Sequence, residues 1–286
     1  YCNMTKIIVC VCSTGTMGSG IAQAAAQAGF YTLLYEPVSQ VLGNAKNRIE
    51  NNLKWLVEKN KIDESEKEAI LQRIQFFDDI QFCQADVFIE AIVEKADIKI
   101  NLFNQLAELN HSECVFATNT SSLSVTAIAE KIQKPERVIG MHFFNPATIM
   151  KLVEVVNTPF TNTQTTKTIM ELAKAMGKTP VLCKDAPGFI VNHVARPYYI
   201  ESLRLAEERI SNFETIDKLL EATGFKMGPF HLMDLIGNDV NYAVSCSVYE
   251  QMGKPERLKP SFIQEAKVKD GKLGKKTGEG YFVYQS

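Results

Sequence analysis

One short stretch decides the fold, Ser13-Thr14-Gly15-Thr16-Met17-Gly18-Ser19-Gly20. It follows the apolar segment 6–12, which we expect to be a strand, and leads into the alanine-rich segment 17–28, which we expect to be a helix. Gly15 and Gly18 supply two of the three glycines of the G-x-G-x-x-G pattern, which lets the backbone approach a pyrophosphate. Ser13 stands where the first glycine belongs, so it can strain the tight turn or displace a dinucleotide slightly.

An acidic residue ends the next predicted strand. Residues 31–35 are largely apolar, and Glu36 follows them at roughly the 20-residue spacing from the glycines that a ribose-binding acid has in dinucleotide sites. Glu36 would accept a hydrogen bond from a 2′-hydroxyl and repel a 2′-phosphate, which favours NAD over NADP. The alternatives are a glycine loop that serves only the fold and a surface acid at a strand end.

Helix and strand patterns then alternate through the first two thirds of the chain. We expect helices over 38–59, from a cap at Asp63 to about Arg73, and over 95–109. We expect strands over 86–91, 115–118, 138–142 and 152–156. This alternation predicts an α/β fold with a doubly wound, mainly parallel sheet. Asp185-Ala186-Pro187-Gly188 breaks the pattern, and the rest of the chain is mainly helical in pattern, so we predict two domains, 1–186 and 187–286.

Two of the predicted strands each carry one ionisable side chain. His142 closes the segment 138–142, Glu154 lies within 152–156, and Asn145-Pro146-Ala147 between them predicts a turn. Antiparallel pairing would bring imidazole and carboxylate together, and a carboxylate among apolar neighbours needs such a partner. A carboxylate that orients an imidazole is the arrangement of a general base. The alternatives are a structural ion pair and a partly exposed edge strand.

A polar run, Thr118-Asn119-Thr120-Ser121-Ser122, follows the strand predicted over 115–118. Ligands of a doubly wound sheet bind beyond the carboxyl ends of its strands, which is where this run and His142 both lie. For any single residue of the run, position alone slightly favours the alternative of helix capping.

Composition is typical of a soluble enzyme. The chain has 286 residues, of which 45% are hydrophobic. Its net charge is −2, so it has no overall positive field of the kind that attracts nucleic acid. No apolar run approaches the roughly 20 residues of a membrane span. We recognise no secretory signal before the first strand and expect a cytoplasmic protein. Cysteines 10, 12, 83, 114 and 183 lie in or beside apolar runs and are expected to be small buried residues, and no Cys/His cluster has metal-ligand spacing.

Four motifs in register resemble the L-3-hydroxyacyl-CoA dehydrogenase family. They are Gly15 to Gln23, Asn119-Thr120-Ser121-Ser122-Leu123, Gly140-Met141-His142-Phe143-Phe144-Asn145-Pro146 and Asp185 to Asn192. Within the family the chain looks most similar to the bacterial 3-hydroxybutyryl-CoA dehydrogenases. The resemblance implies a Rossmann-type NAD-binding domain, an all-helical C-terminal domain for substrate binding and dimerisation, and an active site in the cleft between them.

The resemblance also assigns roles to individual residues. It implies His142 as catalytic base, Glu154 as its orienting acid, Ser121 as a hydrogen-bond partner of the substrate C3 oxygen, and Asn192 near the acyl thioester. The implied cofactor contacts are Gly15, Thr16, Met17, Gly18, Glu36, Glu94, Lys99, Asn119 and Asn145. Lys59 is the implied contact for the CoA portion. The chain departs from the family pattern at Ser13, at Trp55 where a second basic residue is expected, and at His231 and Asn238.

The implied activity is the NAD-dependent interconversion of (S)-3-hydroxyacyl-CoA and 3-oxoacyl-CoA, with a short acyl chain, in fatty acid metabolism such as beta-oxidation. His142 would take the proton from the 3-hydroxyl, and Glu154 would stabilise the imidazolium that forms. The expected partners are an acyl-CoA substrate and a second copy of the chain. Three alternatives stay open: a related NAD enzyme of a non-CoA hydroxy or sugar acid, a non-catalytic binding or structural relative, and a fragment-like function within a larger multifunctional complex.

Overall fold

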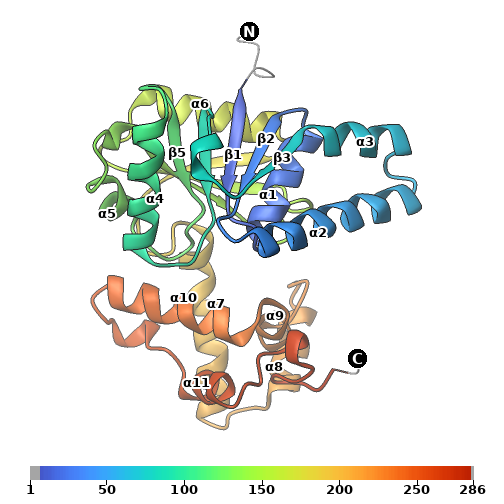
Figure 1. Ribbon diagram of the computed structural model, residues 1–286. Helices are drawn as coiled ribbons and strands as arrows, with labels where there is room; N and C mark the ends of the chain where they lie inside the picture. The colour runs from blue at the N-terminus through green and yellow to red at the C-terminus, as the bar shows by residue number, and fades with distance from the viewer. Residues whose placement is uncertain (1–6, 285–286) are drawn as a thin grey trace. The chain divides into compact units, whose positions relative to one another are not determined.

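The computed structural model describes residues 7–284, and Figure 1 shows the course of the chain. Contacts within the chain divide the described residues into two units, 7–185 and 186–284. The strand expected over 6–12 begins at Ile8. Lys6 lies outside the described residues, as does the N-terminal segment on which the expectation of no secretory signal rests.

The first unit is built on an eight-stranded sheet of order β3-β2-β1-β4-β5-β6-β7-β8. Its strands are β1 (Ile8–Cys12), β2 (Tyr31–Tyr35), β3 (Ile74–Phe77), β4 (Val87–Glu90), β5 (Val115–Thr118), β6 (Val138–Phe143), β7 (Leu152–Asn157) and β8 (Thr179–Lys184). Neighbours from β3 to β6 pair in parallel, β6 and β7 pair antiparallel, and β8 runs parallel to β7. The carboxyl ends of β1, β2, β4, β5 and β6 therefore share one edge of the sheet.

Helices cover both faces of this sheet, as the doubly wound prediction requires. They are α1 (Thr16–Gln27), α2 (Ser39–Glu58), α3 (Glu64–Gln72), α4 (Ala96–Leu109), α5 (Val125–Ala129) and α6 (Thr163–Ala175). Ile21, Ile49 and Leu172 bring α1, α2 and α6 into one apolar core with alternate residues of the strands. On the opposite face Phe116 of β5 packs against Phe103 of α4, with 5.3 Å between ring centroids.

Several local predictions are confirmed. The bounds of β2 and β5 are those expected, and the Asp63 side chain caps α3 by accepting a hydrogen bond from the Glu66 amide at 2.7 Å. Cysteines 10, 12, 83 and 114 are buried and free. Cys183 is only half-buried, because β8 is an edge strand with one neighbour and most of its residues face outward. The expectation that Cys183 is buried was therefore wrong.

The second unit is helical. It comprises α7 (Val191–Glu207), α8 (Phe213–Ala222), α9 (Pro229–Ile236), α10 (Asn238–Gln251) and α11 (Phe262–Lys269). Phe230 and Tyr281 lie in its apolar core. The buried Asp234 carboxylate accepts hydrogen bonds from the backbone amides of Tyr281 and Phe282 and from the hydroxyl of Tyr284. These bonds fix the final described segment against α9.

Candidate active site

The turn between β1 and α1 carries the glycine-rich motif. Gly15 is the N-cap residue of α1, and Thr16 and Met17 are the first two residues of the helix. A Cβ atom at Gly18 would lie 2.0 Å from the carbonyl oxygen of Ser13, so only glycine lets α1 pack this closely on the end of β1. The first amides of a helix lack helical acceptors and attract anions. The turn therefore offers backbone donors suited to a pyrophosphate.

A cavity of about 330 Å³ lies beside this turn, at the carboxyl ends of β1, β2 and β4. Glu36 lies in its wall and accepts a hydrogen bond from the Thr14 hydroxyl at 2.7 Å. Its other lining residues include Tyr35, Pro37, Ile92, Val93, Ile98 and Leu102. An apolar cavity with one carboxylate at its rim, next to a row of helix amides, fits the adenosine half of NAD.

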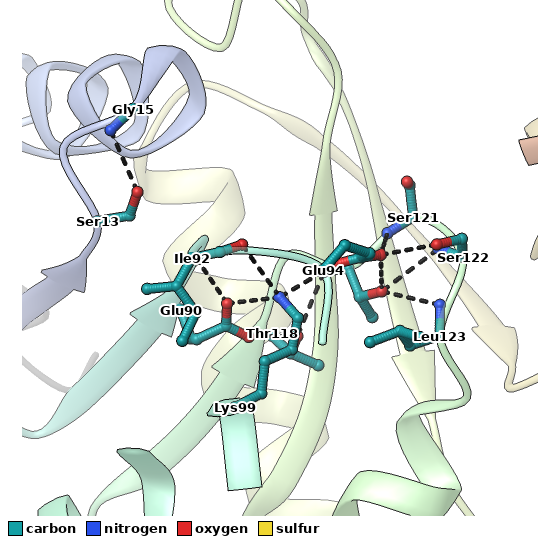
Figure 2. A network of polar contacts seen from close by, with 11 residues as sticks. Ser13, Gly15, Glu90, Ile92, Glu94, Lys99, Thr118, Ser121, Ser122 and Leu123 are labelled. Carbon is teal, nitrogen blue, oxygen red and sulfur yellow. Dashed lines mark hydrogen bonds and ion pairs between the residues drawn. The ribbon is translucent and has the colours of Figure 1, made fainter. Parts of the chain in front are cut away.

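An ion-pair network, buried at Lys99 and Glu90, lies at the carboxyl end of β4 (Figure 2). The Lys99 ammonium, on α4, lies 2.6 Å from Glu90 Oε1 and 3.1 Å from Glu94 Oε2. Glu90 also accepts hydrogen bonds from the Thr118 hydroxyl at 2.8 Å and the Ile92 amide at 2.7 Å. Burial raises the pKa of Glu90, although the neighbouring Lys99 charge acts in the opposite direction. The network joins β4, β5 and α4 below the polar run.

Glu94 connects this network to the polar run that follows β5. Its Oε1 atom accepts hydrogen bonds from the Thr120 hydroxyl, from the Ser122 hydroxyl at 2.8 Å and from the Ser121 amide at 3.2 Å. Burial raises the pKa of Glu94, but the Lys99 charge and the two hydroxyls outweigh it, so the pKa lies below its usual value. Figure 2 shows the Ser121 hydroxyl pointing away from this carboxylate, while its backbone is held by it.

Asn119 joins the polar run to the strand that carries the histidine. Its side-chain oxygen accepts a hydrogen bond from the backbone amide of Phe143 at 2.8 Å. Thr118 is the last residue of β5 that pairs with β6. The hydrogen bond of Asn119, the next residue, therefore continues the contact between the two segments beyond the paired strands. The loop after β5 is thereby fixed in register with the end of β6, one residue after His142.

The predicted pair of His142 and Glu154 is confirmed as a structural unit. The two residues are direct partners in the antiparallel ladder of β6 and β7, and His142 Nδ1 lies 2.8 Å from Glu154 Oε2. Both are buried, at 6% and 1% exposure. The Phe144 ring packs on the imidazole with centroids 4.7 Å apart. With an ionised carboxylate as its partner, Nδ1 donates this hydrogen bond, which leaves Nε2 as the ring nitrogen that can exchange a proton.

The other predicted site residues lie in different surroundings. Asn145 is exposed in the turn after β6, and Lys59 is exposed at the C-cap of α2. Lys99, a predicted cofactor contact, is 1% exposed and bound to carboxylates. Asn192 belongs to the second unit, where it is the second residue of α7 and its carbonyl accepts a hydrogen bond from Arg196 Nε at 3.0 Å.

Two supporting residues are absent from the sequence prediction. On sequence alone, Glu90 is expected in a buried strand and has no assigned role. An acid within an apolar run needs a partner when it is buried, and this could have indicated that Glu90 forms an ion pair. Lys178 gives no such signal. Its ammonium donates to the carbonyls of Ala147 and Met150, which holds the turn that follows β6 and Asn145, and burial lowers its pKa.

Among residues 7–284 no cluster of three or more His, Cys, Asp or Glu side chains could hold a metal ion. Within the same range no helix has the length and apolar character to cross a membrane.

A Rossmann-type sheet with a dinucleotide turn and an acid-oriented histidine at its carboxyl edge defines the class of nicotinamide-dependent dehydrogenases. The family models agree with this class and refine it. Residues 8–186 match the NAD binding domain of 3-hydroxyacyl-CoA dehydrogenase, and residues 188–284 match its C-terminal domain. The chain belongs to the 3-hydroxyacyl-CoA dehydrogenase family.

Individual relatives cover nearly the whole chain. The 3-hydroxyadipyl-CoA dehydrogenase of Escherichia coli K12 is 45% identical over 280 residues, which are 97% of this chain and 59% of that protein. The probable 3-hydroxybutyryl-CoA dehydrogenase of Deinococcus radiodurans is 38% identical over 96% of this chain and 99% of its own length. The crystal structure of 3-hydroxybutyryl-CoA dehydrogenase from E. coli K12 superposes with a TM-score of 0.94 at 45% identity, over 98% of this chain and 60% of that one. The chain thus spans about three fifths of the two E. coli sequences.

Proposed function

We propose that the protein is an NAD-dependent 3-hydroxyacyl-CoA dehydrogenase that interconverts (S)-3-hydroxyacyl-CoA and 3-oxoacyl-CoA. The observation that carries the proposal is the buried His142–Glu154 pair at the carboxyl edge of a dinucleotide-binding sheet. The names of the relatives support a CoA thioester as substrate, and a short acyl chain such as 3-hydroxybutyryl or acetoacetyl.

His142 and Glu154 perform the acid–base chemistry in this proposal. In the oxidative direction His142 Nε2 takes the proton of the substrate 3-hydroxyl, and in the reductive direction it returns that proton to the C3 oxygen. Glu154, at 2.8 Å from Nδ1, fixes the tautomer and stabilises the imidazolium. Ser121 holds the C3 oxygen through its hydroxyl, and Asn192 of the second unit binds near the thioester carbonyl. A bound nicotinamide would supply the hydride acceptor or donor.

The cofactor would be held by the groups around the glycine-rich turn. The amides from Gly15 to Gly18 would bind the pyrophosphate, and Glu36 would bind the adenosine ribose. Glu94, Asn119 and Asn145 would contact the cofactor nearer to its nicotinamide. Lys99 is bound to Glu90 and Glu94, so we assign it the role of positioning Glu94 rather than of touching the cofactor.

The first domain, 1–186, would bind NAD and the second, 187–286, would bind substrate and a second copy of the chain. Leu219, Phe225 and Phe262 of the second unit are exposed apolar side chains, which a second copy of the chain would cover. Lys59 would contact the CoA portion. The proposal includes a cytoplasmic homodimer acting in fatty acid metabolism, such as beta-oxidation. Light scattering of the purified protein tests the dimer.

The function is tested by NADH oxidation with acetoacetyl-CoA, monitored as loss of NADH absorbance. Parallel reactions replace the thioester with free acetoacetate, or NADH with NADPH. Turnover with acetoacetyl-CoA and NADH alone is the expected result. Turnover with a free hydroxy or oxo acid would overturn the CoA assignment in favour of a related dehydrogenase. NADH binding without turnover of either substrate would favour a non-catalytic relative.

A further inference from the structure

Ser13 has a backbone conformation that glycine adopts freely and other residues rarely do. Its φ angle is 149°, between the end of β1 and the N-cap of α1. An L-amino acid in this region is strained, and such strain persists only where the surroundings impose it. Ser13 is also buried, at 8% exposure, and lines the cavity that contains Glu36. The residue is therefore held in a strained conformation beside the proposed dinucleotide site.

The neighbours of Ser13 impose this conformation. The carbonyl of Thr14 accepts hydrogen bonds from the Ser19 hydroxyl at 2.9 Å and from Arg48 at 3.2 Å. The Thr14 hydroxyl is bound to Glu36, and the Ser13 carbonyl lies against Gly18. The turn is thus fixed on both sides of Ser13, and the serine cannot relax without disturbing α1.

The Ser13 side chain also uses a donor that belongs to the phosphate-binding turn. Its Oγ atom accepts a hydrogen bond from the backbone amide of Gly15 at 3.2 Å, and Figure 2 shows this contact. Gly15 is the glycine at which the motif brings its backbone to the pyrophosphate. A hydroxyl bound to this amide occupies a donor that would otherwise be available to an anion, whereas a glycine at position 13 has no atom there.

We infer that Ser13 is an affinity-determining residue, whose hydroxyl competes with the dinucleotide phosphate for the Gly15 amide and weakens NAD(H) binding. The inference rests on the proposed function only in taking NAD(H) as the ligand of this turn. It concerns cofactor affinity and leaves the acid–base chemistry of His142 and Glu154 unaltered. Its consequence is a chain that holds NAD(H) less tightly than the same chain with glycine at position 13.

The test is a set of NADH titrations, monitored by fluorescence, with wild type, Ser13→Ala and Ser13→Gly. Ser13→Ala removes the hydroxyl and keeps the Cβ atom, so tighter binding by about fivefold is expected if one hydrogen bond is freed for the phosphate. Ser13→Gly should bind at least as tightly as Ser13→Ala. Ser112→Ala, in an exposed loop, is the matched serine control and should bind as wild type does.

Ligand fragments locate the effect. Competition by ADP-ribose, which carries the pyrophosphate, should strengthen in both Ser13 variants, and competition by adenosine, which has no phosphate, should not change. Unchanged or weaker NADH binding by Ser13→Ala would overturn the inference. Weaker binding would mean that the Ser13 hydroxyl itself donates a hydrogen bond to the phosphate. If neither the wild type nor any of the variants binds NADH, both the inference and the assignment of NAD(H) as cofactor are overturned. Binding without acetoacetyl-CoA turnover would reject only the proposed substrate.

Discussion

Lys99 and Glu90 form an ion pair that solvent barely reaches, with 2.6 Å between Nζ and Oε1 and side-chain exposures of 1% and 0%. The pair lies where β4 ends and α4 begins, so it supports the polar run without belonging to it. The charge of a buried lysine is tolerated here because two carboxylates and the carbonyl of Ile92 surround it.

Removing this cation should destabilise the first unit. Lys99→Met leaves Glu90 buried without its counter-charge, which costs about 3–5 kcal/mol of unfolding free energy. The double variant Lys99→Met with Glu90→Gln removes both charges and should recover most of the loss. Urea unfolding of wild type, single and double variants measures this. A loss below about 1 kcal/mol in the single variant would show that the pair contributes little.

Replacing Glu154 should affect turnover and spare cofactor binding. Glu154→Gln keeps the shape of the side chain but cannot stabilise an imidazolium, so turnover should fall by roughly 10²-fold or more. NADH affinity should stay at the wild-type value. Glu171→Gln, a half-exposed acid on α6, is the matched control. Steady-state kinetics beside an NADH titration separate the two effects, and a variant that keeps a tenth of wild-type turnover would exclude Glu154 from the proposed mechanism.

The strain at position 13 predicts an order of stability between two variants. Ser13→Ala keeps a Cβ atom at φ 149°, whereas Ser13→Gly relieves a strain of about 1–3 kcal/mol and loses about 0.4–1 kcal/mol through greater freedom of the unfolded chain. The glycine variant should therefore be more stable than the alanine variant by about 1 kcal/mol. Thermal melting without cofactor compares them, and equal melting temperatures would refute the strain.

The lowered pKa of Glu94 makes the free energy of unfolding depend on pH in the acidic range. Its pKa is below the ordinary value of 4.5, so the folded state binds this proton less readily than the unfolded state does. The contribution of Glu94 is complete above that ordinary value and is lost as the pH falls through the lower folded pKa. Glu94→Gln should accordingly be less stable than wild type at neutral pH, and the difference should narrow in acid. Urea unfolding at several pH values measures the gap, and a constant gap would contradict the assignment.

The parts of the fold that the sequence predicts are those with strong local patterns. Strands β2 and β5 are short, apolar and bounded by polar residues, which gave their ends correctly. The prediction omitted β3, where only Ile74 is fully buried, and α6, whose first turns are rich in threonine. Both elements form because they complete the edge and one face of the sheet, which is tertiary information.

The candidate site shows the same division. Pairing of His142 with Glu154 followed from two short strands joined by a turn, because strand alternation fixes which side chains face each other. The burial of Lys99 could not be predicted, since lysine is ordinarily exposed and Glu94 and Glu90 approach it only through the fold. The contact of Ser13 with the Gly15 amide likewise depends on one backbone angle, which residue type alone does not reveal.

The antiparallel ladder of β6 and β7 has a consequence for engineering of this enzyme class. His142 and Glu154 face each other because they are partners in the ladder, and the connection from 144 to 151 joins the two strands without belonging to either of them. Changes to the connection can therefore reshape the surroundings of the histidine, provided that Phe144 on the imidazole, the proposed cofactor contact Asn145 and the carbonyls held by Lys178 keep their place.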